Sequence, residues 1–197
     1  MNDIQENWKK LLSSQILKDN LISISLFLTT FELLKKRVID MTELFFSNGF
    51  DENNEYIINN EEYFKKVISK NKSKIYAALL WFKELEAIDS NDIDAFDAIR
   101  QHRNELAHNT FDFISDAKKN LDFTKFSRLL DLLFKIERWW VINFELPLNS
   151  TLNFTELDLD NMITASQWQF RLLFDIASGN EPKENFYLSK ILESPNN

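Results

Sequence analysis

Cysteine is absent from this 197-residue chain, and glycine and proline occur only two and three times. The absence of cysteine excludes disulfide bonds and thiolate metal sites, and it leads us to expect a protein of the reducing cytoplasm. Average usage is about 7% for glycine and about 5% for proline. Because these two residues are the strongest breakers of regular structure, their scarcity predicts an all-α fold.

The chain also lacks a long apolar run and an excess of basic residues. Its most apolar stretch, 21–31, falls well short of the ~20 residues that cross a bilayer, and the first residues show no secretory pattern. We therefore expect a soluble, cytoplasmic protein without a membrane association. The net charge of −8 argues against broad nonspecific binding of nucleic acid, but it leaves room for a small positive cleft.

Hydrophobic periodicity predicts one helical domain over residues 1–197, with an antiparallel bundle at 20–147 and a helical extension at 148–197. Pro147 and Gly179 mark expected helix ends. Residues 51–60 and 109–122 are expected to be loops. The predicted helices cover residues 3–18, 20–46, 75–88, 92–108, 124–144, 155–178 and 184–192, with one more beginning at Glu61.

The stretch 92–111, DIDAFDAIRQHRNELAHNTF, contains both histidines of the chain. We expect it to be a helix capped by Ser90. At about 100° per residue, Phe96 and Ala107 mark the centre of its apolar stripe, and Arg103 falls between them. A buried guanidinium costs several kcal/mol unless it is paired or reaches water. Arg103 therefore requires either a carboxylate, for example Glu32, or a polar cleft.

The same projection groups four polar side chains along one edge of this helix. Arg100 and Asn104 lie beside Arg103, and His108 lies further round the same flank. His102 faces away from this edge, and we expect it on the surface. The sequence thus predicts one polar edge that contains a histidine, an amide and two guanidinium groups.

The segment Arg103-Asn104-Glu105-Leu106-Ala107-His108 resembles the Arg-x4-6-His signature of HEPN domains, a family of helical bundles. Thr110 stands where some toxin members of the family carry tyrosine. The resemblance implies a HEPN-like bundle at 20–147, followed by extra C-terminal helices. It also implies a metal-independent endoribonuclease of antiviral defence or of a toxin–antitoxin pair. Two copies of the motif would meet across a homodimer, and an antitoxin or defence-system protein would be a further partner.

On this hypothesis Arg103, Asn104 and His108 are catalytic, Arg100 contacts the substrate RNA, and no metal or cofactor takes part. Cleavage of RNA without metal needs a base, donors for the phosphorane and a proton for the leaving oxygen. His108 can transfer protons near neutral pH, Arg103 offers a planar fork of donors to phosphate, and Asn104 can orient either group. The products would carry 2′,3′-cyclic phosphate and 5′-hydroxyl ends.

Two alternatives stay open. Arg103 can belong to a purely structural ion pair, in which case the chain is a catalytically silent HEPN-like module for dimerisation or partner binding. The lysine-rich segment 65–74 can contact RNA backbone, although a solvated helix junction is the better interpretation. The sequence has no glycine-rich phosphate loop, and two histidines without cysteine make a poor metal site.

Overall fold

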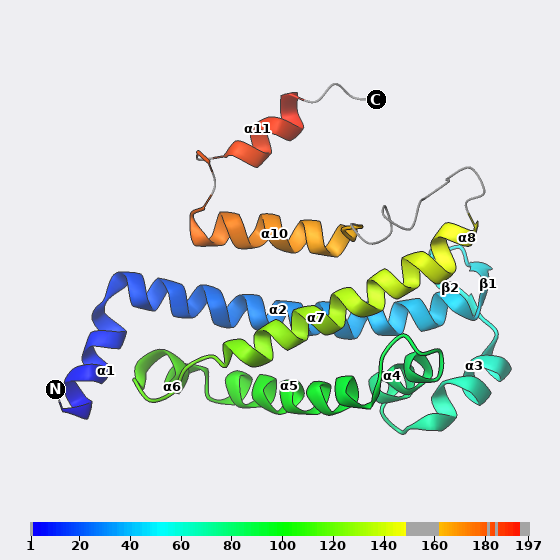
Figure 1. Ribbon diagram of the computed structural model, residues 1–197, viewed down its shortest axis with the longest axis horizontal. Helices are drawn as coiled ribbons and strands as arrows, with labels where there is room; N and C mark the ends of the chain where they lie inside the picture. The colour runs from blue at the N-terminus through cyan, green and yellow to red at the C-terminus, as the bar shows by residue number, and fades with distance from the viewer. Residues whose placement is uncertain (1, 149–161, 181, 184, 194–197) are drawn as a thin grey trace.

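The computed structural model describes residues 2–148, 162–180, 182–183 and 185–193, and in these ranges the chain is mostly helical (Figure 1). The mostly helical character confirms the main part of the predicted fold class. The elements in chain order are α1 Asp3–Leu12, α2 Ser14–Phe45, β1 Ser47–Phe50, β2 Tyr56–Ile58, α3 Asn60–Lys66, the 3-10 turn η1 Ile68–Lys70, α4 Lys74–Glu84, α5 Ser90–His108, α6 Thr110–Ser115, α7 Phe123–Trp140, the π-helical turn η2 Val141–Glu145, α8 Leu146–Leu148, α10 Ala165–Ser178 and α11 Phe186–Glu193.

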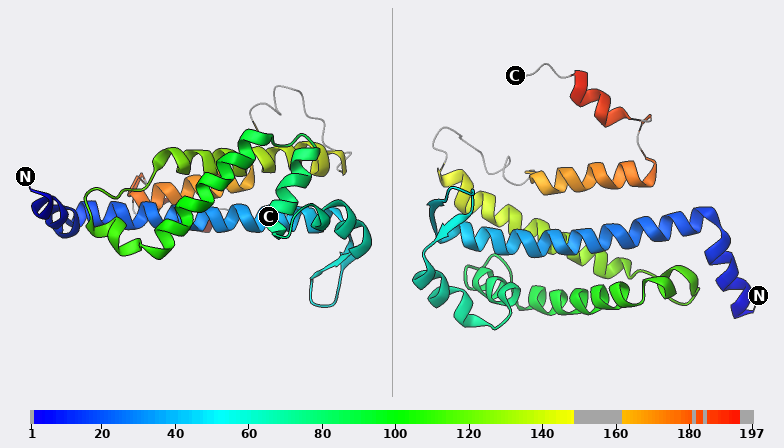
Figure 2. Two further views of the ribbon diagram at one scale, coloured as in Figure 1. Left: turned by 90° about the horizontal axis from the view of Figure 1, so that it is seen from below. Right: turned by 180° about the vertical axis from the view of Figure 1, so that it is seen from behind.

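Three long helices form the centre of the bundle. α2 runs the length of the molecule, α5 returns alongside it, and α7 crosses both in the direction of α2 (Figures 1 and 2). α4 packs against α2 near the end where α2 terminates. α10 lies along the opposite side of α2 from α5 and runs antiparallel to α2 (Figure 1).

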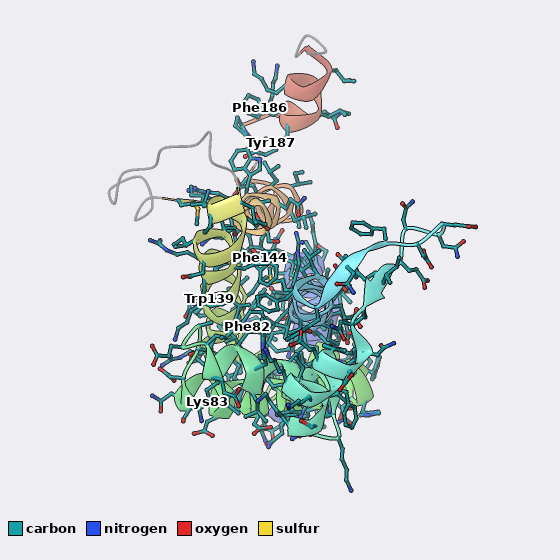
Figure 3. The ribbon with its side chains drawn as sticks, turned by 90° about the vertical axis from the view of Figure 1, so that its right-hand side faces the viewer. Phe82, Lys83, Trp139, Phe144, Phe186 and Tyr187 are labelled. Atoms are coloured by element: carbon teal, nitrogen blue, oxygen red, sulfur yellow. The ribbon has the colours of Figure 1, made fainter. Side chains whose placement is uncertain are left out.

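The core lies between α2, α4, α5 and α7, and it is rich in aromatic rings. Phe82 of α4 meets Trp139 of α7 edge to face, with ring centroids 5.8 Å apart (Figure 3). Phe31 of α2 stacks on Phe96 of α5 at 5.8 Å. Offset and edge-to-face pairs of this kind stabilise a core beyond the area that they bury. The largest fully buried side chains are Trp140, Phe27, Phe82, Phe96, Leu34, Leu79, Ile99, Leu106, Leu129, Leu133, Ile136 and Val38.

A two-stranded antiparallel hairpin interrupts the helices, and the all-α prediction was wrong in this detail. β2 lies inside the loop expected at 51–60, and its partner β1 directly precedes that loop. Phe50 and Tyr56 face each other across the hairpin with ring centroids 5.2 Å apart. The Asp51 carboxylate accepts hydrogen bonds from the backbone N–H groups of Asn53 and Glu55 and closes the turn. Strands of three and four residues are too short for a period-two pattern to stand out.

Several helix boundaries differ from those expected. α2 begins at Ser14 rather than Asn20, and residues 110–115 form the short helix α6 inside an expected loop. The N-cap of α5 is Asp89 rather than Ser90, because the Asp89 side chain accepts from the N–H groups of Asn91 and Asp92. Asp89 and Asp92 form a reciprocal capping box, in which the Asp92 carboxylate accepts from the Asp89 N–H.

The C-terminal part of the chain packs on the bundle through α10. Residues 155–161 of the expected helix 155–178 lie outside the described residues. Residues 162–164 are not helical, so the helix prediction was wrong there: α10 starts after Thr164, which caps it through the Gln167 N–H. Gly179 ends α10 in the left-handed conformation with φ of +69°, as predicted. α11 lies beyond α10 and away from the bundle, with Phe186 and Tyr187 at its start (Figures 1 and 3). Across the described ranges, every helix is too short or too polar to span a membrane.

Candidate functional site

The buried face of α5 is rotated away from Arg103, toward His102, relative to the face that we expected. Its buried residues are Phe96, Ile99, His102 and Leu106, whereas Ala107 is exposed. The sequence projection excluded His102 from the stripe because the residue is polar, and this exclusion moved the centre toward Arg103. Arg103 instead lies at the border of the buried face, with a side chain that is 31% exposed. The guanidinium is therefore not sealed inside the bundle.

Arg103 is held by three groups. Its Nη2 donates to Oε1 of Glu32 on α2 at 2.6 Å, and its Nη1 donates to Oδ1 of Asn104 at 3.4 Å. The guanidinium carbon lies 5.5 Å from the centroid of the Phe31 ring, within the range of a cation–π contact. The Nε atom is buried and has no hydrogen-bond partner among the described residues. The structure thus contains the Arg103–Glu32 ion pair that the sequence suggested as one alternative.

The Glu32 carboxylate is shared between two cations and remains half exposed. Lys35 Nζ lies 3.2 Å from Oε2 of Glu32, and the Glu32 side chain is 46% exposed. Partial burial of the carboxyl group opposes ionisation, but the hydrogen bonds from Lys35 and Arg103 outweigh this effect and hold the pKa of Glu32 below its ordinary value. Glu32 is therefore an anion at neutral pH. An ion pair this exposed contributes only ~0–1 kcal/mol, so a phosphate can replace the carboxylate on Arg103.

Arg100 lies one turn before Arg103 and is positioned by α4. Its Nε donates to the Tyr76 hydroxyl at 2.9 Å, and its Nη2 lies 3.9 Å from Oδ1 of Asp97. The Tyr76 hydroxyl in turn donates to Asp97. Burial of the phenol and its hydrogen bond to Asp97 raise the pKa of Tyr76, so the hydroxyl stays protonated. The Arg100 side chain is 42% exposed, and its terminal nitrogens can reach an incoming ligand.

His108 lies in the last turn of α5 and is exposed. No hydrogen bond or ion pair engages its ring within the described parts of the chain. It follows Asn104 by four residues, and side chains at this spacing are neighbours on a helix surface. Arg103, Asn104 and His108 therefore share one open edge of α5, whereas Arg100 extends that edge toward α4.

The surface position expected for His102 was wrong. The residue is 6% exposed, and its ring contacts the edges of Phe27 and Phe113 at centroid distances of 5.4 and 5.8 Å. Its Nε2 accepts a hydrogen bond from the Asp122 N–H at 3.1 Å. Because Nε2 is an acceptor, the ring is neutral with its proton on Nδ1, 3.8 Å from the Glu105 carboxylate. His102 joins α5 to the start of α7 and is not available to a substrate.

This burial predicts a pH-dependent stability. Desolvation and the nearby Lys125 lower the pKa of His102, and Asp122 and Glu105 oppose this effect only in part. The unfolded chain then binds a proton more readily than the folded one. The contribution of His102 to stability is fully present above its unfolded pKa of about 6.5, and it decreases as pH falls from there toward the lower folded value.

We expect the free energy of unfolding of the wild type to fall between pH 7 and pH 5.5, with a slope of at most ~1.4 kcal/mol per pH unit from this group. His102→Gln keeps an acceptor for the Asp122 N–H but cannot titrate, so its profile should be flatter. His108→Gln, at the exposed histidine, is the matched control and should follow the wild type. Urea denaturation at a series of pH values measures all three; parallel wild-type and His102→Gln profiles would contradict the assignment.

Sequence reasoning missed Tyr76, since a tyrosine in the first turn of an apolar helix carries no signal of a polar contact. Three lysines of the lysine-rich segment 65–74 take part in ion pairs. Lys66, Lys70 and Lys74 pair with Glu62, Glu84 and Glu43, respectively. In the described ranges, no group of three or more histidine, aspartate or glutamate side chains is arranged to hold a metal ion.

No protein-family model, curated protein or solved structure matches the chain. The HEPN resemblance therefore rests on the residues of α5 alone.

Proposed function

We propose that the chain is a HEPN-type, metal-independent endoribonuclease that acts in antiviral defence or as the effector of a toxin–antitoxin pair. The observation that carries the proposal is the edge of α5 where a partly exposed arginine, an amide and an exposed histidine follow one another. These are the group types that cleavage of a phosphodiester without metal requires. The HEPN-like character of the bundle at 20–147 belongs to the same proposal.

In the reaction, the RNA phosphate takes the place of the Glu32 carboxylate on Arg103, which then stabilises the negative charge that develops on the phosphorane. His108 removes the proton of the 2′-hydroxyl, and the 2′ oxygen forms its bond to phosphorus as the 5′ oxygen leaves. Asn104 orients the guanidinium through the contact at 3.4 Å. Arg100, held by Tyr76, contacts a neighbouring phosphate.

The leaving 5′ oxygen also needs a proton, and one His108 cannot serve as base and acid in the same step. The second histidine comes from a second copy of the chain, because a two-fold axis places equivalent residues opposite each other. The exposure of His108 at the end of α5 is compatible with such a homodimer. An antitoxin or another defence protein that covers this edge would inhibit the enzyme.

Incubation of the purified protein with total RNA and with tRNA in EDTA tests the proposal. We expect fragments with 2′,3′-cyclic phosphate and 5′-hydroxyl ends, and we expect none from His108→Ala. RNA patterns that are identical for the wild type and His108→Ala would exclude the nuclease assignment.

The carboxylate of Glu32 competes with phosphate for Arg103, and this competition gives a further prediction. In a His108→Ala background, Glu32→Gln should tighten binding of a short RNA up to about fivefold, the equivalent of the roughly 1 kcal/mol of an exposed ion pair. The control is Glu61→Gln, which removes the same charge at an exposed position of α3. Fluorescence anisotropy measures both, and equal affinities for the two variants would show that Glu32 does not compete with phosphate for Arg103.

The second candidate function is a catalytically silent HEPN-like module for dimerisation or partner binding. The observation in its favour is the Arg103–Glu32 pair itself, which already satisfies part of the guanidinium in the absence of RNA. On this alternative, Arg103 ties α5 to α2 and His108 has no chemical role. Absence of RNA cleavage, together with a large loss of stability on removal of Arg103, would favour it.

A further inference from the structure

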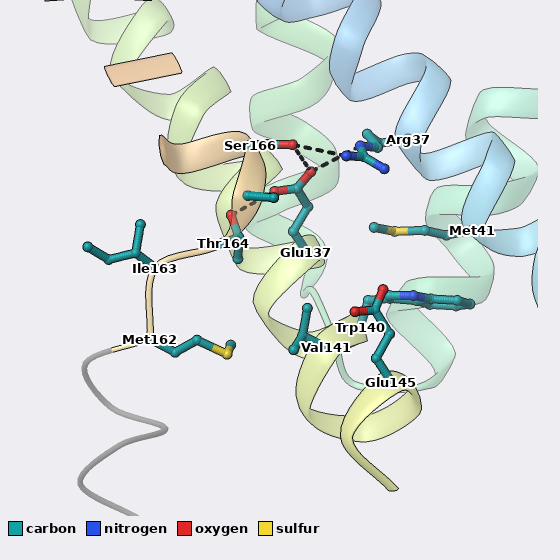
Figure 4. A pocket seen from close by; sticks show the side chains of 11 residues that line it. Arg37, Met41, Glu137, Trp140, Val141, Glu145, Met162, Ile163, Thr164 and Ser166 are labelled. Atoms are coloured by element: carbon teal, nitrogen blue, oxygen red, sulfur yellow. Dashed lines mark hydrogen bonds and ion pairs between the residues drawn. The ribbon is translucent and has the colours of Figure 1, made fainter. Parts of the chain in front are cut away.

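A second candidate site lies at the C-terminal end of α7, between α2, the π-helical turn η2 and the start of α10. A cavity of about 240 Å³ opens there (Figure 4). This volume is slightly below that of typical ligand pockets, ~300–1,000 Å³, and it suits a small molecule. Met41, Trp140, Val141 and Met162 give the cavity an apolar lining. The charged side chains that line it are Arg37, Glu137 and Glu145.

Glu137 is buried and has its own partners. One carboxylate oxygen accepts from the Thr164 hydroxyl at 2.8 Å, and the other accepts from the Ser166 hydroxyl at 2.5 Å (Figure 4). Arg37 Nε lies 3.3 Å from the second oxygen and balances the charge. Arg37 and Glu137 therefore form a compensated pair, which leaves Glu145 as the charge in the cavity without a counter-ion.

Glu145 reaches the cavity because α7 changes to a wider helix before it ends. In η2 the Leu146 N–H bonds to the Val141 carbonyl, five residues back, instead of the carbonyl four residues back. Single π-helical turns of this kind are frequent at functional sites. Glu145 is exposed, has no hydrogen-bond or ion-pair partner in the described part of the chain, and lies with Trp140 at the end of the cavity opposite Arg37 and Ser166 (Figure 4).

We propose that this cavity binds a small organic cation, namely a primary ammonium or guanidinium group on a short apolar body. The cationic head pairs with the Glu145 carboxylate at the end of the cavity opposite Arg37. The apolar body fills the space against Met41 and Met162. A monocation cancels the single uncompensated charge of the lining, whereas an anion would add a second negative charge beside Glu145. The inference does not depend on the proposed nuclease activity.

The methionines provide a direct readout. Met41 and Met162 both line the cavity. In spectra of protein labelled with carbon-13 at the methionine methyl groups, 3-methylbutylamine should shift the Met41 and Met162 signals in a saturable way. The neutral 3-methylbutan-1-ol and the anionic 3-methylbutanoate have nearly the same shape and should bind more weakly, the alcohol by up to about fivefold.

Glu145→Gln should weaken binding of the amine up to about fivefold, because an ion pair to an exposed carboxylate contributes no more than ~1 kcal/mol. The matched control, Asp131→Asn, removes an exposed carboxylate of α7 outside the cavity and should bind like the wild type. Both positions are exposed, so the fold should tolerate both changes. The proposal is overturned if the amine shifts neither methyl group, if the alcohol binds as well as the amine, or if Glu145→Gln binds the amine with unchanged affinity.

Discussion

Replacement of His108 by alanine is expected to lower the rate of RNA cleavage at least about 100-fold and to leave the melting temperature unchanged. The rate falls because proton transfer by a positioned side chain contributes about 10²- to 10⁴-fold. Stability is preserved because the ring is exposed and makes no hydrogen bond or ion pair in the described part of the chain. Initial rates on a short RNA in EDTA, together with a thermal melt of the same samples, measure both quantities.

Arg103→Ala separates the two functions that the geometry permits. If Arg103 contacts the phosphate, its removal should lower the cleavage rate by a similar factor. Loss of its half-exposed ion pair with Glu32 should lower the free energy of unfolding by no more than about 1 kcal/mol. Arg103→Lys should stay impaired, because an ammonium lacks the planar fork. Arg128→Ala, which removes an exposed arginine of α7, is the control for overall charge. Strong destabilisation by Arg103→Ala, together with no RNA cleavage by the wild type, would point to the silent module.

The helical bundle was predictable because the composition and the periodicity agree over most of the chain. The polar edge of α5 was also predictable in its membership, since Arg103, Asn104 and His108 follow from a helical projection. How deeply each of these side chains is buried was not predictable from the projection. A histidine counts as polar in a projection, yet His102 is buried because its ring packs on Phe27 and Phe113 and also accepts a backbone hydrogen bond.

Other features depend on contacts between segments that are distant in the sequence. The hairpin at 47–58 is held partly by a side-chain turn at Asp51, and its strands are too short to show a pattern. Tyr76 and Arg100 meet only because α4 packs beside α5. The Glu137 network joins residues of α2, α7 and the start of α10, and a glutamate on the apolar face of α7 gives no indication of which hydroxyls will reach it.

This last network predicts a large loss of stability on replacement of Glu137 by alanine. The change leaves the buried hydroxyls of Thr164 and Ser166 without an acceptor and Arg37 without its counter-ion. Hydrogen bonds to a charged group contribute ~1.5–3 kcal/mol each. Arg37 is 41% exposed and stays partly solvated, so we expect a loss of about 3 kcal/mol rather than the larger value of a fully buried pair. Urea denaturation measures the loss.

Local unfolding of the Glu137→Ala variant should begin in α10. Ser166 is the one residue of α10 that is buried, so the helix depends on Glu137 and on the contact of Phe170 with Phe126, whose ring centroids lie 6.0 Å apart. Elements with few buried contacts open before the rest of a fold. Hydrogen exchange of Glu137→Ala should therefore accelerate in α10 and much less in α2 and α5. Glu137→Gln, which keeps the volume and an acceptor oxygen, should lose less stability, and Asp131→Asn on the same helix should lose none. If α10 keeps its protection in Glu137→Ala, the buried carboxylate does not hold this helix on the bundle.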